Sequence, residues 1–259
     1  MGNEYPKVMN NKTAHQPELT WRDFRMHNLH IQHDKMLYLK DVADIIDAHR
    51  LTNDFCNIPD TTYNWYLSQT PAGSGAGTIQ CLGMVNGVLN IPTEGDDGDN
   101  AELTQRCECW QFEDCYPLYA ELRFYIDDVL DTDFWFGFVT GHSWLTPPAD
   151  YAVFHKDDGD AYLDFSNTVT GGAVTNSLQI MSLVKCTWYR LGIHWDGGNN
   201  LRYFVIEDGD FPQTILATGL HNTNIPTTVL NVGFGIQSGE DEVKNLYVDY
   251  IKCAQKRVI

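Results

Sequence analysis

The block Asn231–Cys253, near the end of the 259-residue chain, places the tightest constraint on the fold. Two apolar runs with a period of two flank the polar turn Gln237–Asn245: they are Val232, Phe234 and Ile236, then Leu246, Val248 and Tyr250. Such alternation is typical of β-strands, whose successive side chains point to opposite faces. Two strands at the end of a chain need earlier partners, so the block predicts a β-sandwich rather than a nucleotide-binding α/β fold.

The chain from Leu51 onward shows the same texture. Short apolar or alternating runs are separated by clusters of Gly, Asn, Asp and Pro, which is typical of strands joined by turns. Asp157–Asp160 and Asp196–Asn200 predict hairpins, because Gly and Asx residues adopt the positive φ of tight turns. The expected strands are Tyr63–Leu67, Thr78–Leu82, Val88–Ile91, Cys107–Phe112, Leu118–Ile126, Phe134–Thr140, Tyr151–His155, Ala161–Ser166, Leu178–Met181, Thr187–Trp195, Leu201–Ile206, Val229–Gln237 and Asn245–Cys253.

The first fifty residues differ from the rest in charge. Residues 1–50 hold seven Lys/Arg and seven Asp/Glu, so residues 51–259 carry the whole net charge of −18. We therefore predict two parts: an N-terminal segment, residues 1–50, and a β domain, residues 51–259. An acidic body argues against binding nucleic acid or anionic membranes, both of which need a basic face. It favours solubility and repulsion between free copies.

The N-terminal segment is expected to contain two kinds of structure. Residues 1–34 are polar and lack a sustained period, which predicts an extended arm that becomes ordered only against something else. Residues 35–50 predict a short helix, with an apolar stripe formed by Leu39, Val42, Ile45 and Ile46. A strand at Met36–Leu39 followed by one helical turn is the alternative.

Targeting and redox signals are few. The chain has no apolar run of the ~18 residues that a transmembrane helix requires. The N-terminal residues lack the apolar region of a secretory signal, so we expect no export. Seven cysteines without an export signal predict reduced thiols in a cytosol.

Metal binding has weak candidates. Asp96, Asp97 and Asp99 lie in an acidic turn that contains a glycine, and carboxylate oxygens are ligands that Ca²⁺ prefers. The EF-hand spacing is missing and such turns are common without metal, so no cofactor is expected beyond this one Ca²⁺ candidate. Cys107, Cys109 and Cys115 lack a fourth zinc ligand, and Cys107 and Cys109 are better interpreted as small buried hydrophobes on a strand.

Catalytic motifs are missing. The paired-carboxylate pattern E-x-D-x-x-E of many sandwich glycosidases does not occur, nor do G-x-S-x-G, H-E-x-x-H or a phosphate loop. Glu121-Leu122-Arg123 is superficially like the arginine-containing strand of some alginate lyases, but the companion His and Tyr motifs are not found. Glu121 is therefore expected to be a solvent-facing strand residue. We predict a protein that is not an enzyme, with a polysaccharide hydrolase or lyase as an alternative.

Exposed tryptophans could bind a sugar by stacking. Trp144 lies in the proline-rich loop GHSWLTPPAD and is the tryptophan that we expect to be exposed to a glycan ligand. Trp135 and Trp195 lie in alternating runs and fit a core equally well, and Trp188 is a further candidate.

The order of the pieces in the second half of the chain carries a resemblance. Leu122–Phe138 is followed by the hairpins Tyr151–Phe165 and Tyr189–Gly209 and by the closing block with GIQSGE and VDYIK. This order resembles a group of tailed-phage virion proteins with a concanavalin-like (LamG-type) jelly roll, over residues 100–253.

The resemblance implies a fold and a function. The fold would be all-β, a concanavalin-like jelly-roll β-sandwich of two antiparallel sheets, preceded by the extended arm and short helix. The function would be that of a structural virion protein, a capsid decoration or head-auxiliary protein assembled in the host cytoplasm. Its partners would be the major capsid protein and neighbouring copies of itself, with residues 1–50 docking and the sandwich projecting outward. A carbohydrate-binding tail-fibre or surface domain is the alternative.

Overall fold

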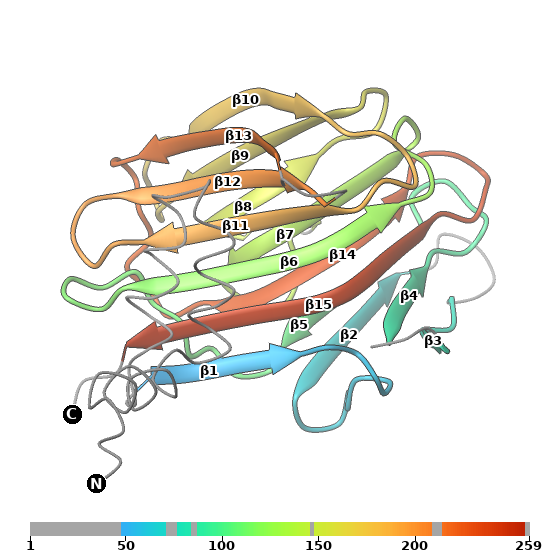
Figure 1. Cartoon of the computed structure of the whole chain (residues 1–259), viewed down its shortest axis with the longest axis horizontal. Coiled ribbons are helices and arrows are strands. Elements are labelled where there is room, and N and C mark those ends of the chain that lie inside the picture. Colours follow the sequence, from blue (N-terminus) through green and yellow to red (C-terminus); the bar gives the residue numbers. More distant parts are fainter. Residues whose placement is uncertain (1–47, 71–76, 84–86, 146–147, 209–213, 257–259) are drawn as a thin grey trace, which may run out of the picture.

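Fifteen antiparallel strands build the described part of the chain (Figure 1). The computed structural model describes residues 48–70, 77–83, 87–145, 148–208 and 214–256. The strands are β1 (Ala48–Asn53), β2 (Trp65–Thr70), β3 (Gln80–Leu82), β4 (Val88–Pro92), β5 (Asn100–Gln105), β6 (Leu118–Ile126), β7 (Thr132–Val139), β8 (Tyr151–Lys156), β9 (Tyr162–Thr168), β10 (Thr175–Ser182), β11 (Tyr189–Trp195), β12 (Leu201–Glu207), β13 (Thr214–His221), β14 (Asn231–Ser238) and β15 (Asn245–Lys256). No helix that could span a membrane occurs among these residues.

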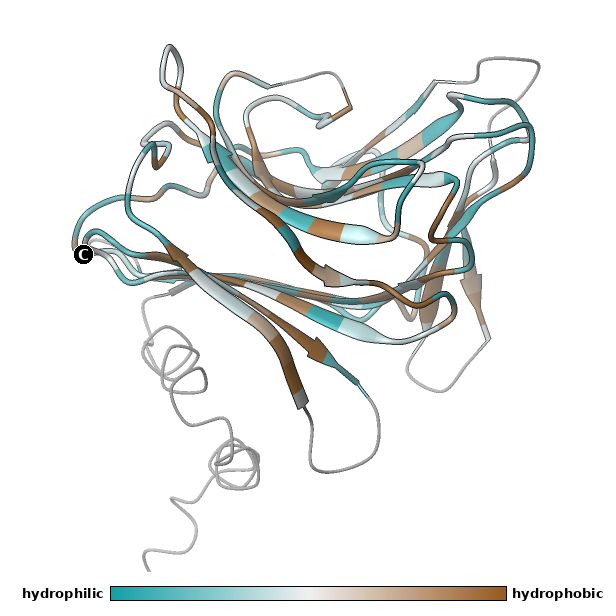
Figure 2. Ribbon diagram, turned by 90° about the horizontal axis from the view of Figure 1, so that it is seen from above, coloured by the Kyte–Doolittle hydropathy of each residue, from teal (hydrophilic) through white to brown (hydrophobic). Residues whose placement is uncertain are grey.

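The strands form two sheets packed face to face, as Figure 2 shows from above. Sheet A has the order β13-β12-β11-β6-β15-β4-β3, and β1 pairs with β15 beside β4. Sheet B has the order β10-β9-β8-β7-β14-β5-β2. Within the described residues the protein is thus a sandwich of two antiparallel sheets, which confirms the predicted all-β class.

The core lies between the sheets and is rich in aromatic side chains. Phe124 of sheet A stacks on Phe134 of sheet B, with ring centroids 4.4 Å apart and an angle of 3° between the planes. Phe134, Phe136 and Phe138 recur on the inner face of β7 and belong to the same buried cluster. A fully buried Phe contributes roughly 1.5–3 kcal/mol, so one such strand supplies a large part of the stability.

The closing block behaves as its pattern predicts. β14 is an interior strand of one sheet, between β7 and β5, and β15 is an interior strand of the other, between β6 and the pair β4 and β1. Val232, Phe234 and Ile236 are fully buried in the core. The chain therefore ends by completing both sheets at once.

Three strands were not predicted, and one prediction was wrong. β1, β5 and β13 lie outside the expected strands. Cys107–Phe112 does not form a strand, and its residue Trp110 makes an isolated bridge with Leu230. β5 is mostly polar, because the side chains of one of its faces point away from the core. The more apolar segment that follows it, Cys107–Phe112, was predicted as the strand instead.

The N-terminal predictions fall mainly outside the described residues. The extended arm at 1–34 and residues 35–47 of the expected helix cannot be compared with the structure. Ala48–Arg50, expected to be the end of that helix, are the start of β1 instead. Pairing with β15 overrides the local helical pattern there, since Leu51 then packs against the core beside Cys253.

Candidate functional site

A buried carboxylate lies beneath a loop on the outer face of sheet B. The chain leaves β7 at Val139 and returns at Tyr151, and its segment Thr140–Leu145 folds back over β5 and β14. The Thr104 hydroxyl donates a hydrogen bond to the His142 carbonyl at 3.2 Å, and the Asn231 amide donates to the Gly141 carbonyl. These contacts hold the loop against the face that points away from the core.

The floor of the site is an indole lying over glycines. Trp135 is fully buried although it points away from the core. A Cβ atom added at Gly233 would lie 2.9 Å from the Trp135 ring, and one added at Gly235 would lie 2.6 Å from its indole nitrogen. The glycines of the closing block therefore make room for this ring, which fills the space beside Glu102.

Glu102 of β5 is the carboxylate of the site. Its two oxygens accept hydrogen bonds from the Ser143 hydroxyl at 2.8 Å and from the Trp144 backbone N–H at 3.0 Å. Its side chain is 1% exposed, so water does not replace these donors. Sequence inspection missed this residue, because a single Glu in a short polar strand carries no recognisable motif.

The surroundings shift the acidity of Glu102. Burial raises its pKa from 4.5 to about 7, although the hydrogen bonds from Ser143 and Trp144 oppose the shift. Trp135 opposes it as well, although its indole nitrogen does not meet the geometry of a hydrogen bond. The effect of desolvation on the pKa is larger than that of the hydrogen bonds, because all of these donors are neutral. The carboxyl therefore titrates close to neutral pH.

Trp144 forms the outer wall of the site and is half-buried rather than fully exposed. Its ring meets Tyr151 edge-on at 4.5 Å between centroids and lies 5.4 Å from the ring of His155. His155 Nε2 is 2.8 Å from the Ser166 hydroxyl. Three aromatic rings and a hydroxyl thus gather on one part of sheet B. Trp135 and Trp195, for which a core position was as good an expectation as a ligand site, are both buried, whereas Trp188 is half-buried and lies directly before β11.

Glu102 fixes the position of the loop. Both of its oxygens accept hydrogen bonds from loop groups, one from the Ser143 hydroxyl and one from the Trp144 backbone N–H. The buried acid therefore has a structural role in this part of sheet B.

The three predicted Ca²⁺ ligands lie in one turn, and hydrogen bonds involve the carboxylate of Asp99 and the backbone of Asp96 and Asp97. Asp99 is buried, and its Oδ2 accepts a hydrogen bond from the Asp96 backbone N–H at 3.1 Å. The Asp97 backbone N–H donates to Asp241 at 3.2 Å. Among the described residues, Asp96, Asp97 and Asp99 are not brought together with the spacing of metal ligands.

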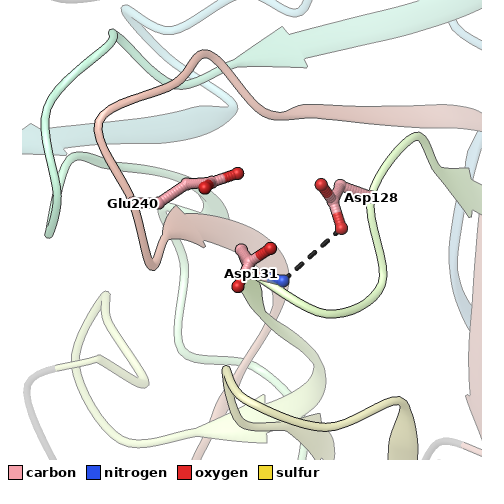
Figure 3. A group of neighbouring side chains, drawn as sticks. All are labelled: Asp128, Asp131 and Glu240. Atoms are coloured by element: carbon pink, nitrogen blue, oxygen red, sulfur yellow. Dashed lines mark hydrogen bonds between the residues drawn. The ribbon is translucent and has the colours of Figure 1, made fainter.

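A different acidic group has that spacing (Figure 3). Asp128, Asp131 and Glu240 each offer an oxygen, and these oxygens lie within 4.8 Å of one another. Lys244, which is 2% exposed, already supplies a cation: its Nζ donates to Asp128 at 2.9 Å and to Glu240. Burial acts to lower the pKa of Lys244, but the two carboxylates raise it overall. The lysine makes this group an ion-pair cluster.

Glu121 is buried, which corrects the expectation that it faces solvent. It is 8% exposed and accepts hydrogen bonds from the hydroxyls of Tyr119 and Tyr250. Burial acts to raise its pKa, yet the positive charges of Arg190 and Lys252 lower it overall. The sequence could not reveal this, because the tyrosine and arginine partners come from β15 and β11 as well as from its own strand.

The cysteines show no zinc-binding arrangement among the described residues. All seven are free thiols. Cys107 and Cys115 are exposed and Cys109 is half-buried, so the interpretation of Cys107 as a buried hydrophobe was wrong. The segment lies in a connection rather than on a strand, and period-two burial does not apply there.

Comparisons with known proteins reveal the fold and no closer kinship. No family model and no curated protein matches the chain. Solved structures do. A protein of unknown function from Shewanella oneidensis MR-1 has a TM-score of 0.60 at 14% identity, covering 82% of this chain and 90% of the other. Arcelin-5, a lectin-like defence protein from Phaseolus vulgaris, has 0.53 at 13%, covering 82% and 100%.

A phage protein is also among the similar structures. The CBM2 module of the evolved Dit of Lactobacillus casei BL23 phage J-1 has a TM-score of 0.51 at 13% identity, covering 82% of this chain and 98% of that module. At such identities the likeness shows the fold alone. The chain has a lectin-like, concanavalin-like jelly-roll fold, as its sequence predicted.

Proposed function

We propose that the protein is a structural virion protein without enzymatic activity, a capsid decoration or head-auxiliary protein. It would dock on the major capsid protein and on neighbouring copies through its N-terminal segment, assemble in the host cytoplasm and project the sandwich from the capsid surface as a homo-oligomer. The observation that carries the proposal is the register Ala48↔Lys256. The first and last described residues pair, so the N-terminal 47 residues join the sandwich at one corner of sheet A.

The distribution of charge also supports a docking role for the N-terminal segment and an outward position for the sandwich. Residues 1–47 hold six Lys/Arg and seven Asp/Glu, which leaves 11 and 28 for the rest of the chain. Copies of so acidic a body repel one another in solution, while a nearly neutral segment is free of this repulsion and can wrap a large surface when it becomes ordered. The CBM2 module of a phage Dit protein has a jelly-roll fold similar to that of this chain.

Deletion of residues 1–47 tests the proposal. The cut stops before Ala48, because removal of Ala48–Arg50 would also destroy β1. We expect the truncated protein to keep a cooperative thermal transition and to lose association with particles, measured as copies per particle by quantitative mass spectrometry. A folded truncated protein that loads normally onto particles refutes the anchoring role.

A second candidate function is glycan binding on the outer face of sheet B. The specific observation is the group of Trp144 and His155, which are half-buried, with the buried Tyr151 beside them, since accessible rings next to fixed hydrogen-bonding groups are the chemistry that binds sugar faces. A glycan array with the wild type should give signals that Trp144→Ala abolishes and that Trp188→Ala, at a position beside Tyr125 of sheet A, retains. The array is repeated with EDTA to detect a need for Ca²⁺. An array without signal in either condition rejects this function.

A further inference from the structure

The outer face of sheet A carries an apolar cluster. Tyr119 of β6, Phe204 and Ile206 of β12 and Ala254 of β15 form it, with Ile215 of β13 packed against them. The rings of Tyr119 and Phe204 stack at 6.2 Å with 26° between their planes. We call this set the sheet A cluster.

The register places the sheet A cluster on the side away from the core. Tyr119 lies opposite His194 and Ala254, and Phe204 lies opposite Gly192, whereas the neighbouring Leu118, Leu122 and Val205 belong to the core between the sheets. The side chains of a strand alternate between faces, so the two sets cannot share one side.

The cluster is nevertheless shielded from water. Tyr119 is 3% exposed, and Phe204 and Ile206 are each 4% exposed. His194, on the same face, has its pKa lowered to about 3 by burial. The described strands form only two layers, and sheet B packs on the opposite side of sheet A. Side chains this well buried on the outer face of a two-layer sandwich require a third layer of structure that covers them.

We propose that residues 35–47 of the same chain form this third layer, as an amphipathic helix lying across the outer face of sheet A. Their apolar stripe, Leu39, Val42, Ile45 and Ile46, would meet the sheet A cluster. The segment ends at Asp47, directly before β1, which is itself a strand of sheet A beside β15. The occupant is therefore tethered next to the surface that it covers.

The lengths agree. A helix rises 1.5 Å per residue, so 13 residues span about 20 Å. Neighbouring strands lie about 4.8 Å apart, and the four steps from β1 through β15, β6 and β11 to β12 span about 19 Å. One helix from the corner of β1 reaches the three strands that carry Tyr119, Phe204, Ile206 and Ala254.

The segment has the amphipathic pattern that the proposal needs. At about 100° per residue, Asp41, Asp44 and Asp47 would lie on the side of the helix away from the apolar stripe, so the stripe would meet the sheet A cluster while the acids face outward. The inference does not rest on the virion role, and it leaves residues 1–34 free for docking.

Hydroxyl-radical footprinting of the full chain tests the inference, because it reports the exposure of single side chains. Ile46→Asp places a charge in the stripe, and we expect labelling of Tyr119 and Phe204 to rise at least fivefold. Lys40→Asp is the matched control: it also introduces an aspartate but on the opposite side of the helix, and labelling should change less than twofold. Tyr63, which is 78% exposed, serves as the internal dose standard.

Deletion of residues 1–47 gives a second measurement if Ile46→Asp is tolerated without an effect. The sheet A cluster should then label as strongly as exposed rings and bind a hydrophobic dye, in samples shown to be monomeric. Strong labelling in the wild type, or weak labelling in both variants, overturns the inference. Labelling of the wild type that increases on dilution assigns the cover to the arm of a neighbouring copy and also overturns it.

Discussion

Two buried glutamates, one on the outer face of each sheet, show what decides the charge of a carboxyl in this protein. Glu102 of sheet B is surrounded by neutral donors, and burial raises its pKa to about 7. Glu121 of sheet A is equally withdrawn from water, but Arg190 and Lys252 lower its pKa. Burial is the largest single cause in both cases, and the presence or absence of a cation decides the direction.

The comparison also separates the roles of the two faces. On sheet B the carboxyl holds a loop whose rings remain partly accessible, which suits recognition. On sheet A, Arg123 pairs with Asp208 and with Asp249, and Arg190 lies 3.6 Å from Asp208, so charges of both signs interlock. Such a network fixes geometry more than it adds stability.

Removal of the cation should have the largest effect. Arg190→Met leaves Glu121 charged and buried without its main partner, and we expect a loss of about 3–5 kcal/mol of unfolding free energy. Urea denaturation at pH 7 measures it. The double variant Glu121→Gln, Arg190→Met should recover most of the loss, whereas Lys185→Met, at an exposed position, should change stability by no more than about 0.5 kcal/mol. Equal losses in the single and double variants would contradict the pairing.

The two glutamates should give stability profiles of opposite slope. The pKa of Glu102 is raised in the folded state, so its contribution is complete below pH 4.5 and is lost as pH rises through about 7. A shift of this size corresponds to about 3 kcal/mol. Denaturation of the wild type and of Glu102→Gln between pH 4.5 and 9 should show the difference, since the amide cannot titrate. A variant with the same profile as the wild type would exclude Glu102 as the titrating group.

Glu121 contributes in the other direction. Its lowered pKa means that stability is present above the ordinary value of 4.5 and is lost as pH falls below it. Glu121→Gln should therefore flatten the acid limb of the profile and leave the neutral limb unchanged.

The ion-pair cluster extends the comparison to a buried cation. Lys244→Met removes the ammonium that Asp128 and Glu240 share, and we expect a loss of about 1–3 kcal/mol in EDTA. The freed oxygens of Asp128, Asp131 and Glu240 should then bind Ca²⁺, which restores about 1.4 kcal/mol at ten times the dissociation constant. Thermal unfolding with and without Ca²⁺ measures both effects. The wild type should not respond, and Asp131→Asn in the variant background should weaken the response.

The smallest expected effect concerns the loop. Ser143→Ala removes one donor to Glu102, and a single hydrogen bond contributes about 1 kcal/mol, more when the acceptor is charged. The loss should be larger at pH 9 than at pH 5, because the carboxylate exists only above its raised pKa. Denaturation at the two pH values tests this; a loss that is the same at both would mean that the hydroxyl does not bond to the carboxylate.

The local pattern predicted the strands that have one apolar face. Leu118–Ile126 was predicted with the observed bounds, because its inner residues alternate with polar ones over nine positions. β5 and β1 were missed. Asn100–Gln105 has only two core residues, and Ala48–Arg50 form the end of the predicted helix. Short segments carry too little apolar periodicity to outweigh a neighbouring, more apolar run.

The candidate site was only partly predictable from the sequence. Trp144 was predicted as a ligand-binding residue from its loop, whereas Glu102, whose carboxylate accepts a hydrogen bond from the Trp144 backbone N–H, was not predicted. Among the described residues, the oxygens at metal-ligand spacing belong to Asp128, Asp131 and Glu240, which come from two connections that are distant in the chain, and not to the turn that holds Asp96, Asp97 and Asp99.

The sequence by itself determined the class of fold, since period-two alternation with Asp-Gly turns admits a sandwich and excludes alternating helices and strands. In strands with a regular alternation, such as β6 and β14, it also determined which residues face inward. Only the tertiary structure decided which side chains the outward-facing residues contact. Glu121 meets Arg190 only because β6 pairs with β11, and Trp135 lies over Gly235 only because β7 pairs with β14. Alternation specifies a face, but the partners on that face come from strand pairing across the chain.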